Sequence, residues 1–315
     1  MFANILIWLA LVIVAGLFAW LARRALRLRN PAARWALVAL ATLPALLFAL
    51  VAGVVGYGYY QFYRPRSAPA VALDTTTTTE RIARGKHLAL TTCVACHARD
   101  GQLPLSGGND LSLDLPLPIG TLVPPNLTPG GSLQNWSDAE IVQAIRNGRH
   151  ESGRTLLMPT EELQNLSDDD LASLIVFLRS QAPIQNQTPA INPSPLLAFF
   201  WGTGMAPVAA PPVSEPVVAP PKRPDAAYGA YIVSYQDCRV CHGADLNGSA
   251  GGLGPAAPSV RAIVSNWTLE QFIQTIRTGV DPGGHAIQPP MPWQMVGRMD
   301  DVELAALYHY IRSLK

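Results

Sequence analysis

The sequence predicts an all-α protein in which two transmembrane helices precede two similar helical domains joined by a Pro-rich linker. Three observations in its 315 residues support this prediction. Two long uncharged apolar runs stand near the N-terminus, and a Cys-x-x-Cys-His motif occurs twice in the remainder. Each copy of the motif is followed by amphipathic segments that begin at helix-capping residues.

The first predicted element is a membrane anchor over residues 1–64. Residues 4–22 and 35–60 contain no charged side chain, and each run is long enough to cross about 30 Å of hydrocarbon as a helix. The arginines between the runs, which the positive-inside rule places in the cytoplasm, are Arg23, Arg24, Arg27, Arg29 and Arg34. We therefore expect both ends of the anchor on the outer face of a bacterial cytoplasmic membrane.

Four details refine the anchor. The opening residues 1–4 lack the basic region of a cleavable signal, so we expect the first helix to be retained. Pro44 is expected to kink the second helix. The pairs of small residues that could permit close helix packing are Ala49 with Gly53 and Ala52 with Gly56. The residues expected to form an aromatic belt at the outer interface are Tyr57, Tyr59, Tyr60, Phe62 and Tyr63.

The repeated motif carries the chemistry. Its residues are Cys93, Cys96 and His97 in the first copy and Cys238, Cys241 and His242 in the second. This spacing is that of c-type haem attachment, in which the thiols bond covalently to the porphyrin and the histidine ligates the iron. A thioredoxin-like pair would stand in a βαβ unit, and a zinc site would need a tetrahedral ligand set. We therefore expect two covalently bound haem c groups and no disulfide, because the motifs use all four cysteines.

The first haem domain is predicted over residues 75–182. A short helix is expected at 80–91, leading into the motif. Ser137, followed by Glu140, opens a helix over residues 138–147. Ser167 caps a final helix that runs through Ser180.

Met158 is the candidate for the second axial ligand of the first iron. It precedes Pro159 on a loop between two predicted helices, and it is the only Met between the first motif and the linker. An iron held by His97 needs a ligand on its other face, and a thioether there raises the reduction potential. An isolated Met more often fills a core. His150 is the competing ligand.

The linker, residues 183–224, is dense in Pro and almost free of charge. Such a segment is expected to be a semi-rigid polyproline spacer that separates the two domains. It contains the apolar patch 196–201, which is too short to span a bilayer. This patch either covers the core of the first domain or rests on the membrane surface or a partner subunit.

The second domain, residues 225–315, repeats the first. Trp136 returns as Trp267, and Arg146 as Arg277. The offsets 291 − 158 and 312 − 179 are both 133, so Met291 keeps the register of Met158 relative to the last helix. This fixed register favours ligation by both methionines, because core filling does not require it. Met295 and Met299 are possible substitutes for Met291 as the ligand. His285 is expected in a loop, and His309 on the surface of the last helix.

Both halves resemble class I cytochrome c domains. The matching features are a glycine in the first helix, the haem motif, a proline loop, the methionine and an aromatic in the last helix. The resemblance implies that Gly85 with Phe177, and Gly229 with Tyr310, mark crossings of the first and last helices. It also implies that the carbonyls of Pro125 and Pro258 accept hydrogen bonds from His97 and His242. The stretches 125–129 and 136–140 are similar to the cytochrome subunits of membrane-bound dehydrogenases.

These features predict an electron-transfer protein rather than an enzyme, because an iron closed by His and Met has no open position for a substrate. We expect single-electron transfer between a membrane complex, either quinol-oxidising or an oxidase, and a periplasmic or membrane partner. Two alternatives stay open. One is the electron-accepting subunit of a periplasmic dehydrogenase, and the other is a dihaem cytochrome c peroxidase, in which one iron is free to bind peroxide.

The charge distribution indicates the kind of partner. The net charge is +6 over residues 1–74, −4 over residues 75–182 and −1 over residues 223–315. Because no basic stripe lies outside the anchor, nucleic acid is not expected as a partner. The mildly acidic haem domains are expected to dock on a basic patch of a redox partner, with an affinity that falls as salt rises.

Overall fold

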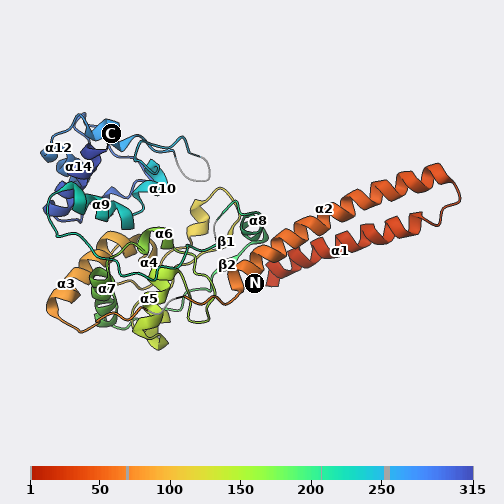
Figure 1. Ribbon diagram of the computed structural model, residues 1–315, viewed down its shortest axis with the longest axis horizontal. Helices are drawn as coiled ribbons and strands as arrows, with labels where there is room; N and C mark the ends of the chain where they lie inside the picture. Colours follow the sequence, from red (N-terminus) through yellow and green to blue (C-terminus); the bar gives the residue numbers. More distant parts are fainter. Residues whose placement is uncertain (1, 69–70, 207, 252–255, 315) are drawn as a thin grey trace.

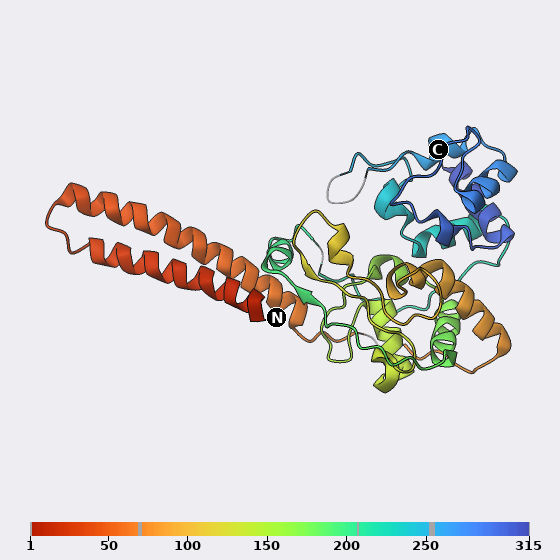
Figure 2. The same ribbon diagram turned by 180° about the vertical axis from the view of Figure 1, so that it is seen from behind.

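A long helical hairpin projects from two packed helical lobes (Figure 1). The computed structural model describes residues 2–68, 71–206, 208–251 and 256–314. Apart from helices, the described residues form one small antiparallel sheet, in which β1 (Gly120–Thr121) pairs with β2 (Asn192–Pro193). The predicted mainly helical architecture is therefore confirmed. The view from behind shows the first haem domain next to the hairpin and the second domain beyond it (Figure 2).

The hairpin consists of α1 (Phe2–Ala25) and α2 (Pro31–Tyr63). Asn30 caps α2 by accepting hydrogen bonds from the amides of Ala32 and Ala33, and Pro31 occupies the first helical position. Both helices are long and apolar enough to cross a membrane. Leucines such as Leu40 and Leu43 are each 69% exposed, so the hairpin offers an apolar surface along most of its length.

Small residues of α2 face α1. The indole Nε1 of Trp8 donates to the carbonyl of Ala52 at 2.8 Å, and a Cβ at Gly56 would contact the same indole ring. Gly53 faces open space, and Ala49 is exposed. Of the two predicted pairs, Ala52 with Gly56 thus packs within the hairpin, and Ala49 with Gly53 is left on its surface.

The helices of the first haem domain follow the predicted order. They are α3 (Thr79–Leu88), a π-helical segment (Ala89–Cys93), α4 (Val94–His97), η2 (Leu111–Asp114), η3 (Ser132–Asn135), α5 (Asp138–Asn147), α6 (Thr160–Leu163) and α7 (Asp168–Ser180). Helices α5 and α7 begin where predicted, because Ser137 Oγ accepts from the amide of Glu140 and Ser167 Oγ from that of Asp170. The first helix ends three residues early in α-form and continues as a π-helix into the haem motif.

The second domain repeats this order. Its helices are α9 (Ala226–Tyr235), α10 (Cys238–His242), α11 (Val260–Val264), α12 (Leu269–Thr278), α13 (Trp293–Val296) and α14 (Asp301–Ser313). Capping boxes at Thr268 and Asp300 start α12 and α14.

A glycine lies at each crossing of a first and a last helix. A Cβ at Gly85 of α3 would meet the Ser173 carbonyl and Phe177 of α7. A Cβ at Gly229 of α9 would meet the Ala306 carbonyl and Tyr310 of α14. Only glycine permits so close an approach of two backbones. The crossings implied by the resemblance are therefore present in both domains.

The apolar patch of the linker packs on the anchor. It forms α8 (Pro195–Thr203), whose Trp201 ring stacks on Phe62 of α2 with centroids 4.9 Å apart. Gly58 of α2 lies against the Ala198 carbonyl, which leaves no room for a larger residue. The patch therefore covers the C-terminal end of α2 and not the core of the first domain, and contact of its remaining surface with the membrane or a partner subunit stays a prediction.

The rest of the linker does not separate the domains. The amide of Val213 donates to Asn147 Oδ1 at 2.8 Å, and the amide of Asp168 donates to the Val217 carbonyl at 2.8 Å. Buried apolar residues of both haem domains form one continuous cluster. The predicted spacer is thus a strap along the first domain, because its backbone and apolar side chains find partners there.

Candidate haem sites

The first motif spans the junction between the π-helical segment and α4. Cys93 ends the π-helical segment, and Cys96 and His97 lie in α4, all three half-buried. The Nδ1 atom of His97 lies 2.8 Å from the carbonyl oxygen of Pro125. A hydrogen bond from Nδ1–H to this carbonyl fixes the ring and leaves Nε2 as the nitrogen available to a metal.

The second motif has the same local geometry. Helix α10 carries Cys238, Cys241 and His242, and His242 Nδ1 lies 2.9 Å from the Pro258 carbonyl. The structure thus brings each motif histidine together with the proline carbonyl that the resemblance implies. The role of both histidines as iron ligands remains a prediction.

All four motif thiols are free. Burial raises the pKa of Cys93 to about 12 and that of Cys238 to about 11. A nucleophilic redox cysteine has a lowered pKa instead, so these thiols do not fit a thioredoxin-like pair. Free paired thiols beside an imidazole with one engaged nitrogen do fit covalent attachment of haem c.

The two candidate methionines occupy equivalent positions. The Met158 carbonyl accepts from the Thr160 amide at 2.7 Å, just before α6. The Met291 carbonyl accepts from the Trp293 amide at 2.9 Å, just before α13. Both side chains are partly buried. This shared backbone geometry agrees with the repeat register, and ligation by either sulfur stays a prediction.

The competing residues have other surroundings. His150 Nδ1 accepts from the Ser152 amide at 3.1 Å, and its ring packs edge-on against Trp136. Met299 is 2% exposed in the core, and Met295 packs half-buried against that core. His285 bonds to Asp281 in an exposed loop, and His309 is exposed on α14, as predicted for both.

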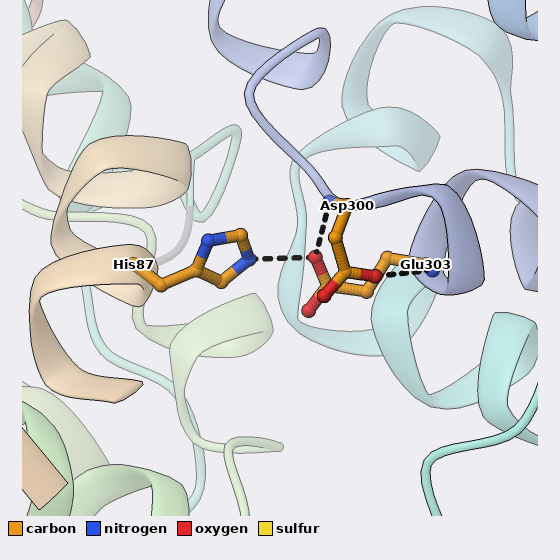
Figure 3. A group of neighbouring side chains, drawn as sticks. All are labelled: His87, Asp300 and Glu303. Carbon is orange, nitrogen blue, oxygen red and sulfur yellow. Dashed lines mark hydrogen bonds and ion pairs between the residues drawn. The ribbon is translucent and has the colours of Figure 1, made fainter. Parts of the chain in front are cut away.

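A charged network joins the two domains across α3, α7 and α14. Arg84 of the first domain forms a double hydrogen bond with Asp170, at 2.7 and 2.8 Å, and reaches Glu303 of the second at 2.9 Å. His87 Nε2 lies 2.6 Å from the other oxygen of Glu303 (Figure 3). The two domains therefore share a nearly buried set of charges.

Glu303 is the most buried member of this network, at 1% exposed. Burial alone would raise its pKa, but the hydrogen bond and charge of His87, followed by Arg84 and Lys222, lower it to about 2. Oxygen or nitrogen atoms of His87, Asp300 and Glu303 lie within 4.8 Å of one another. Lys222 contacts both carboxylates, so the protein's own cations balance this cluster and no metal is required.

The interface repeats itself about an approximate two-fold axis. His87 of the first domain bonds to Glu303 of the second, and the hydroxyl of Tyr231 of the second donates to Asp170 of the first at 2.6 Å. The two pairs are equivalent in the repeat. The first helices of the two domains are offset by 144 residues, as 231 − 87, and the last helices by 133, as 303 − 170.

A second pair of contacts follows the same symmetry. Asn165 Nδ2 donates to the Ser234 carbonyl at 2.9 Å, and Arg298 Nη1 donates to the Leu90 carbonyl at 3.2 Å. The offsets are again 144 and 133, from 234 − 90 and 298 − 165. The two haem domains thus pack like the subunits of an isologous dimer within one chain.

This interface adjoins both haem motifs. Gln236 Nε2, two residues before Cys238, donates to the Thr91 carbonyl at 3.2 Å and to Thr92 Oγ1 at 3.1 Å. Thr92 directly precedes Cys93. Sequence reasoning missed the whole interface. The available signal was the repeat register, which places an acidic residue at the third position of the last helix in each domain. These residues are Asp170 of α7 and Glu303 of α14.

Two family models match the chain. The model described as Cytochrome c matches residues 226–315. The model described as Cytochrome C oxidase, cbb3-type, subunit III matches residues 80–178. Each match contains one haem motif and one candidate methionine.

The chain is also similar to curated cytochromes and dehydrogenase subunits. It is 29% identical to a nicotinate dehydrogenase subunit of Pseudomonas putida over 74% of this chain and 21% of that protein. It is 30% identical to the alcohol dehydrogenase (quinone) cytochrome c subunit of Gluconobacter oxydans, over 63% of this chain and 44% of that protein. The chain thus spans less than half the length of either relative.

A shorter relative is matched over most of its length. The chain is 35% identical to cytochrome c-554(548) of Halomonas halodenitrificans over 29% of this chain and 84% of that protein. The two family matches also agree with the cysteines and histidine of the haem motif in each domain. The chain therefore belongs to the cytochrome c family, with two cytochrome c domains that carry two covalently bound haem c groups and serve electron transfer.

Proposed function

We propose that this chain is the electron-accepting cytochrome subunit of a membrane-bound dehydrogenase. The observation that carries the proposal is its similarity to subunits of named dehydrogenases. These are nicotinate dehydrogenase, alcohol dehydrogenase (quinone) and the fructose dehydrogenase of Gluconobacter japonicus. The first of these similarities extends over 74% of the chain, so it is not confined to one haem motif.

The residues of the chain hold and orient the cofactor. Bound haem c supplies one-electron oxidation and reduction at its iron. In each domain the cysteines fix the porphyrin, and the proline carbonyl orients the histidine ring. Met158 and Met291 are proposed as the second protein ligand of each iron. An iron held by both residues would have no position for a small substrate.

The anchor is proposed to hold this unit at the membrane. Helices α1 and α2 would both span it, with the arginine-rich turn in the cytoplasm and the haem domains on the outer face. The packing of α8 on the end of α2 supports this arrangement, because it ties the first haem domain to the anchor. A companion dehydrogenase on the same face could then deliver electrons directly.

The test is to isolate the native complex from membranes through a tag on this chain and to identify its companions by mass spectrometry. We expect a dehydrogenase subunit, whose substrate reduces the haems in the isolated complex. Recovery of only a quinol-oxidising complex or an oxidase, with no substrate-dependent haem reduction, would contradict the proposal.

A specific observation favours the oxidase as a second candidate. Residues 80–178 match the family model of a cbb3-type oxidase subunit. In that case the chain would pass electrons to an oxidase. The same isolation separates the two candidates, since terminal oxidase subunits would accompany the chain and would oxidise its haems in air. The peroxidase alternative requires a vacant iron position, which the spin state of the two irons would reveal.

A further inference from the structure

An open cavity of about 310 Å³ lies where the anchor meets the first haem domain. Its wall includes Arg66, just beyond α2, and Arg149 and Gly153 of the loop that follows α5. The Arg66 amide donates to the Gly153 carbonyl at 3.0 Å, and the Thr155 amide donates to the Phe62 carbonyl at 3.1 Å. This loop is therefore hydrogen-bonded to the end of α2.

Arg149 is buried in the cavity wall without a partner. Arg149 is only 6% exposed, and its Nε and Nη1 atoms are buried and form no hydrogen bond. Thr155 pairs with Arg149 in a β-bridge, and its buried Oγ1 also has no partner. A buried cation without a counter-charge is strongly unfavourable. A buried guanidinium beside a buried free hydroxyl is the donor set for an anion.

Three further arginines lie on the same loop or just beyond α2. The Nε atoms of Arg64 and Arg66 are also buried and unpaired, whereas Arg66 Nη2 donates to the carbonyl and the side-chain oxygen of Gln61, both at 3.0 Å, and Arg154 lies over the Phe62 ring. Burial, followed by the charges of Arg66 and Arg64, lowers the pKa of Arg149. Within the part of the chain that the structure describes, none of these four arginines forms a salt bridge.

Within the described residues, the two acids of the cavity wall, Glu140 and Glu151, form no salt bridge with these arginines. The Glu140 carboxylate accepts from the amide and the hydroxyl of Ser137, both at 2.7 Å. Glu151 is exposed, next to His150. The cavity wall thus holds two arginines and two glutamates, and its unsatisfied hydrogen-bond donors are the buried nitrogens of the arginines.

The second haem domain lacks this cluster. The bridge between Arg149 and Thr155 returns as a bridge between Val280 and Ala286, each 131 residues further on. Both domains carry haem c, yet only the first has the arginine and the hydroxyl. The first domain differs in its contact with the end of α2. The anion is thus expected to come from the surroundings of the anchor.

We propose that Arg149, Arg66 and Arg64, with the Thr155 hydroxyl, bind the phosphate of a membrane phospholipid. Guanidinium groups bind phosphate oxygens through short, charge-assisted hydrogen bonds. Exposed tyrosines on the last turns of α2, Tyr57, Tyr60 and Tyr63, mark the level of the lipid headgroups. The site lies directly beyond them in the chain. This inference rests on the proposed membrane anchor.

The test uses the full-length, haem-loaded protein in detergent with phosphatidylglycerol as the probe. The variant Arg149→Val with Thr155→Ala copies the second domain. The control Arg261→Val removes one charge from the second domain, where Arg261 only pairs loosely with Asp245. Native mass spectrometry counts retained lipid, and a titration measures affinity. We expect the wild type and the control to retain phosphatidylglycerol and the variant to bind it roughly tenfold more weakly.

Three results would overturn the inference. The first is equal lipid retention by the variant and the wild type. The second is stabilisation by inorganic phosphate alone without retained lipid. The third is a changed reduction potential of the variant in lipid-free detergent, which would place Arg149 on the haem carboxylates. Alkaline extraction of the membranes and haem absorbance, read on the same samples, test the anchor and the haem loading separately.

Discussion

At the scale of single residues, electron transfer depends on which side chains bind the iron. The structure pairs His97 and His242 with proline carbonyls through Nδ1, so that Nε2 of each is left for the metal. It also gives Met158 and Met291 the same backbone setting before a one-turn helix. Residue chemistry and repeat register therefore point to the same axial pair in both domains.

Replacing either methionine tests this pair. In Met158→Leu or Met291→Leu, one iron should lose its sulfur ligand, become high-spin and fall in reduction potential, because thioether ligation raises the potential. Axial ligands set haem potentials over a range of about 0.8 V, so the shift should be large. Met299→Leu is the matched control, because Met299 is packed in the core. Redox titration with spectroscopy checks the result, and an unchanged spectrum in Met158→Leu would argue against its role.

Glu303 makes the contact between the domains sensitive to acid. Its pKa of about 2 lies below the ordinary carboxyl value of 4.5, so its contribution to stability is complete above pH 4.5 and is lost as the pH falls toward 2. The variant Glu303→Gln should be less stable at pH 7 by up to about 3 kcal/mol, and it should lack this pH dependence. Thermal unfolding across this pH range, with exposed Glu161→Gln as the control, makes the comparison.

At the scale of secondary structure elements, close helix contacts set the frame of each haem domain. Gly85 and Gly229 bring the first and last helices into backbone contact. At the anchor, Gly58 allows α8 to lie against α2, where Trp201 stacks on Phe62. The haem domain and the hairpin are therefore connected by packed helices as well as by the covalent chain.

Gly85→Ala should push α3 away from α7. A methyl group there meets the Ser173 carbonyl, so the cost should be that of an overpacked core, about 1–3 kcal/mol. Gly53→Ala is the control, because a Cβ at Gly53 meets no atom within 4 Å. The midpoint of thermal unfolding, followed by haem absorbance, should fall for the first variant and not for the second. Equal midpoints would mean that the crossing is looser than the structure indicates.

At the scale of the whole molecule, the two haem domains form one unit with approximate two-fold symmetry. Equivalent residues exchange partners across the interface, as in the pairs His87 with Glu303 and Tyr231 with Asp170. Gln236 then connects the start of the second motif to the residues just before the first. The pair of domains is thus held in one relative orientation, beside an anchor that α8 ties to the first of them.

A double-mutant cycle tests whether Arg84 and Glu303 act together across the interface. Arg84→Met and Glu303→Gln each remove one partner of a nearly buried pair, so each should destabilise the protein, by less than the roughly 3–5 kcal/mol that breaking a fully buried pair costs, because the Arg84 side chain is 22% exposed. The double variant should lose less than the sum, with a coupling of about 0.5–3 kcal/mol. Additive effects in thermal unfolding would contradict direct contact between the domains.

Local features can be predicted from the sequence, and contacts between distant segments cannot. The caps at Ser137 and Ser167 and the haem motifs depend on neighbouring residues, so these helices and motifs can be anticipated, whereas the contacts of His97 and His242 with proline carbonyls were implied only by the family resemblance. The Arg84–Glu303 pair spans 219 residues and has no local signal. The patch at 196–201 is plainly apolar, but apolarity alone does not say which surface it covers. The same limit explains why the Pro-rich linker is a strap and not the predicted spacer.

The most direct test of the account is the coordination state of the two irons in the purified full-length chain. Electron paramagnetic resonance of the oxidised protein, with magnetic circular dichroism to detect sulfur ligation, reports each iron separately. The account predicts two low-spin, six-coordinate irons, each with one histidine and one methionine, and no turnover of peroxide. A high-spin iron with a vacant position, together with peroxide turnover, would contradict it and support the peroxidase alternative.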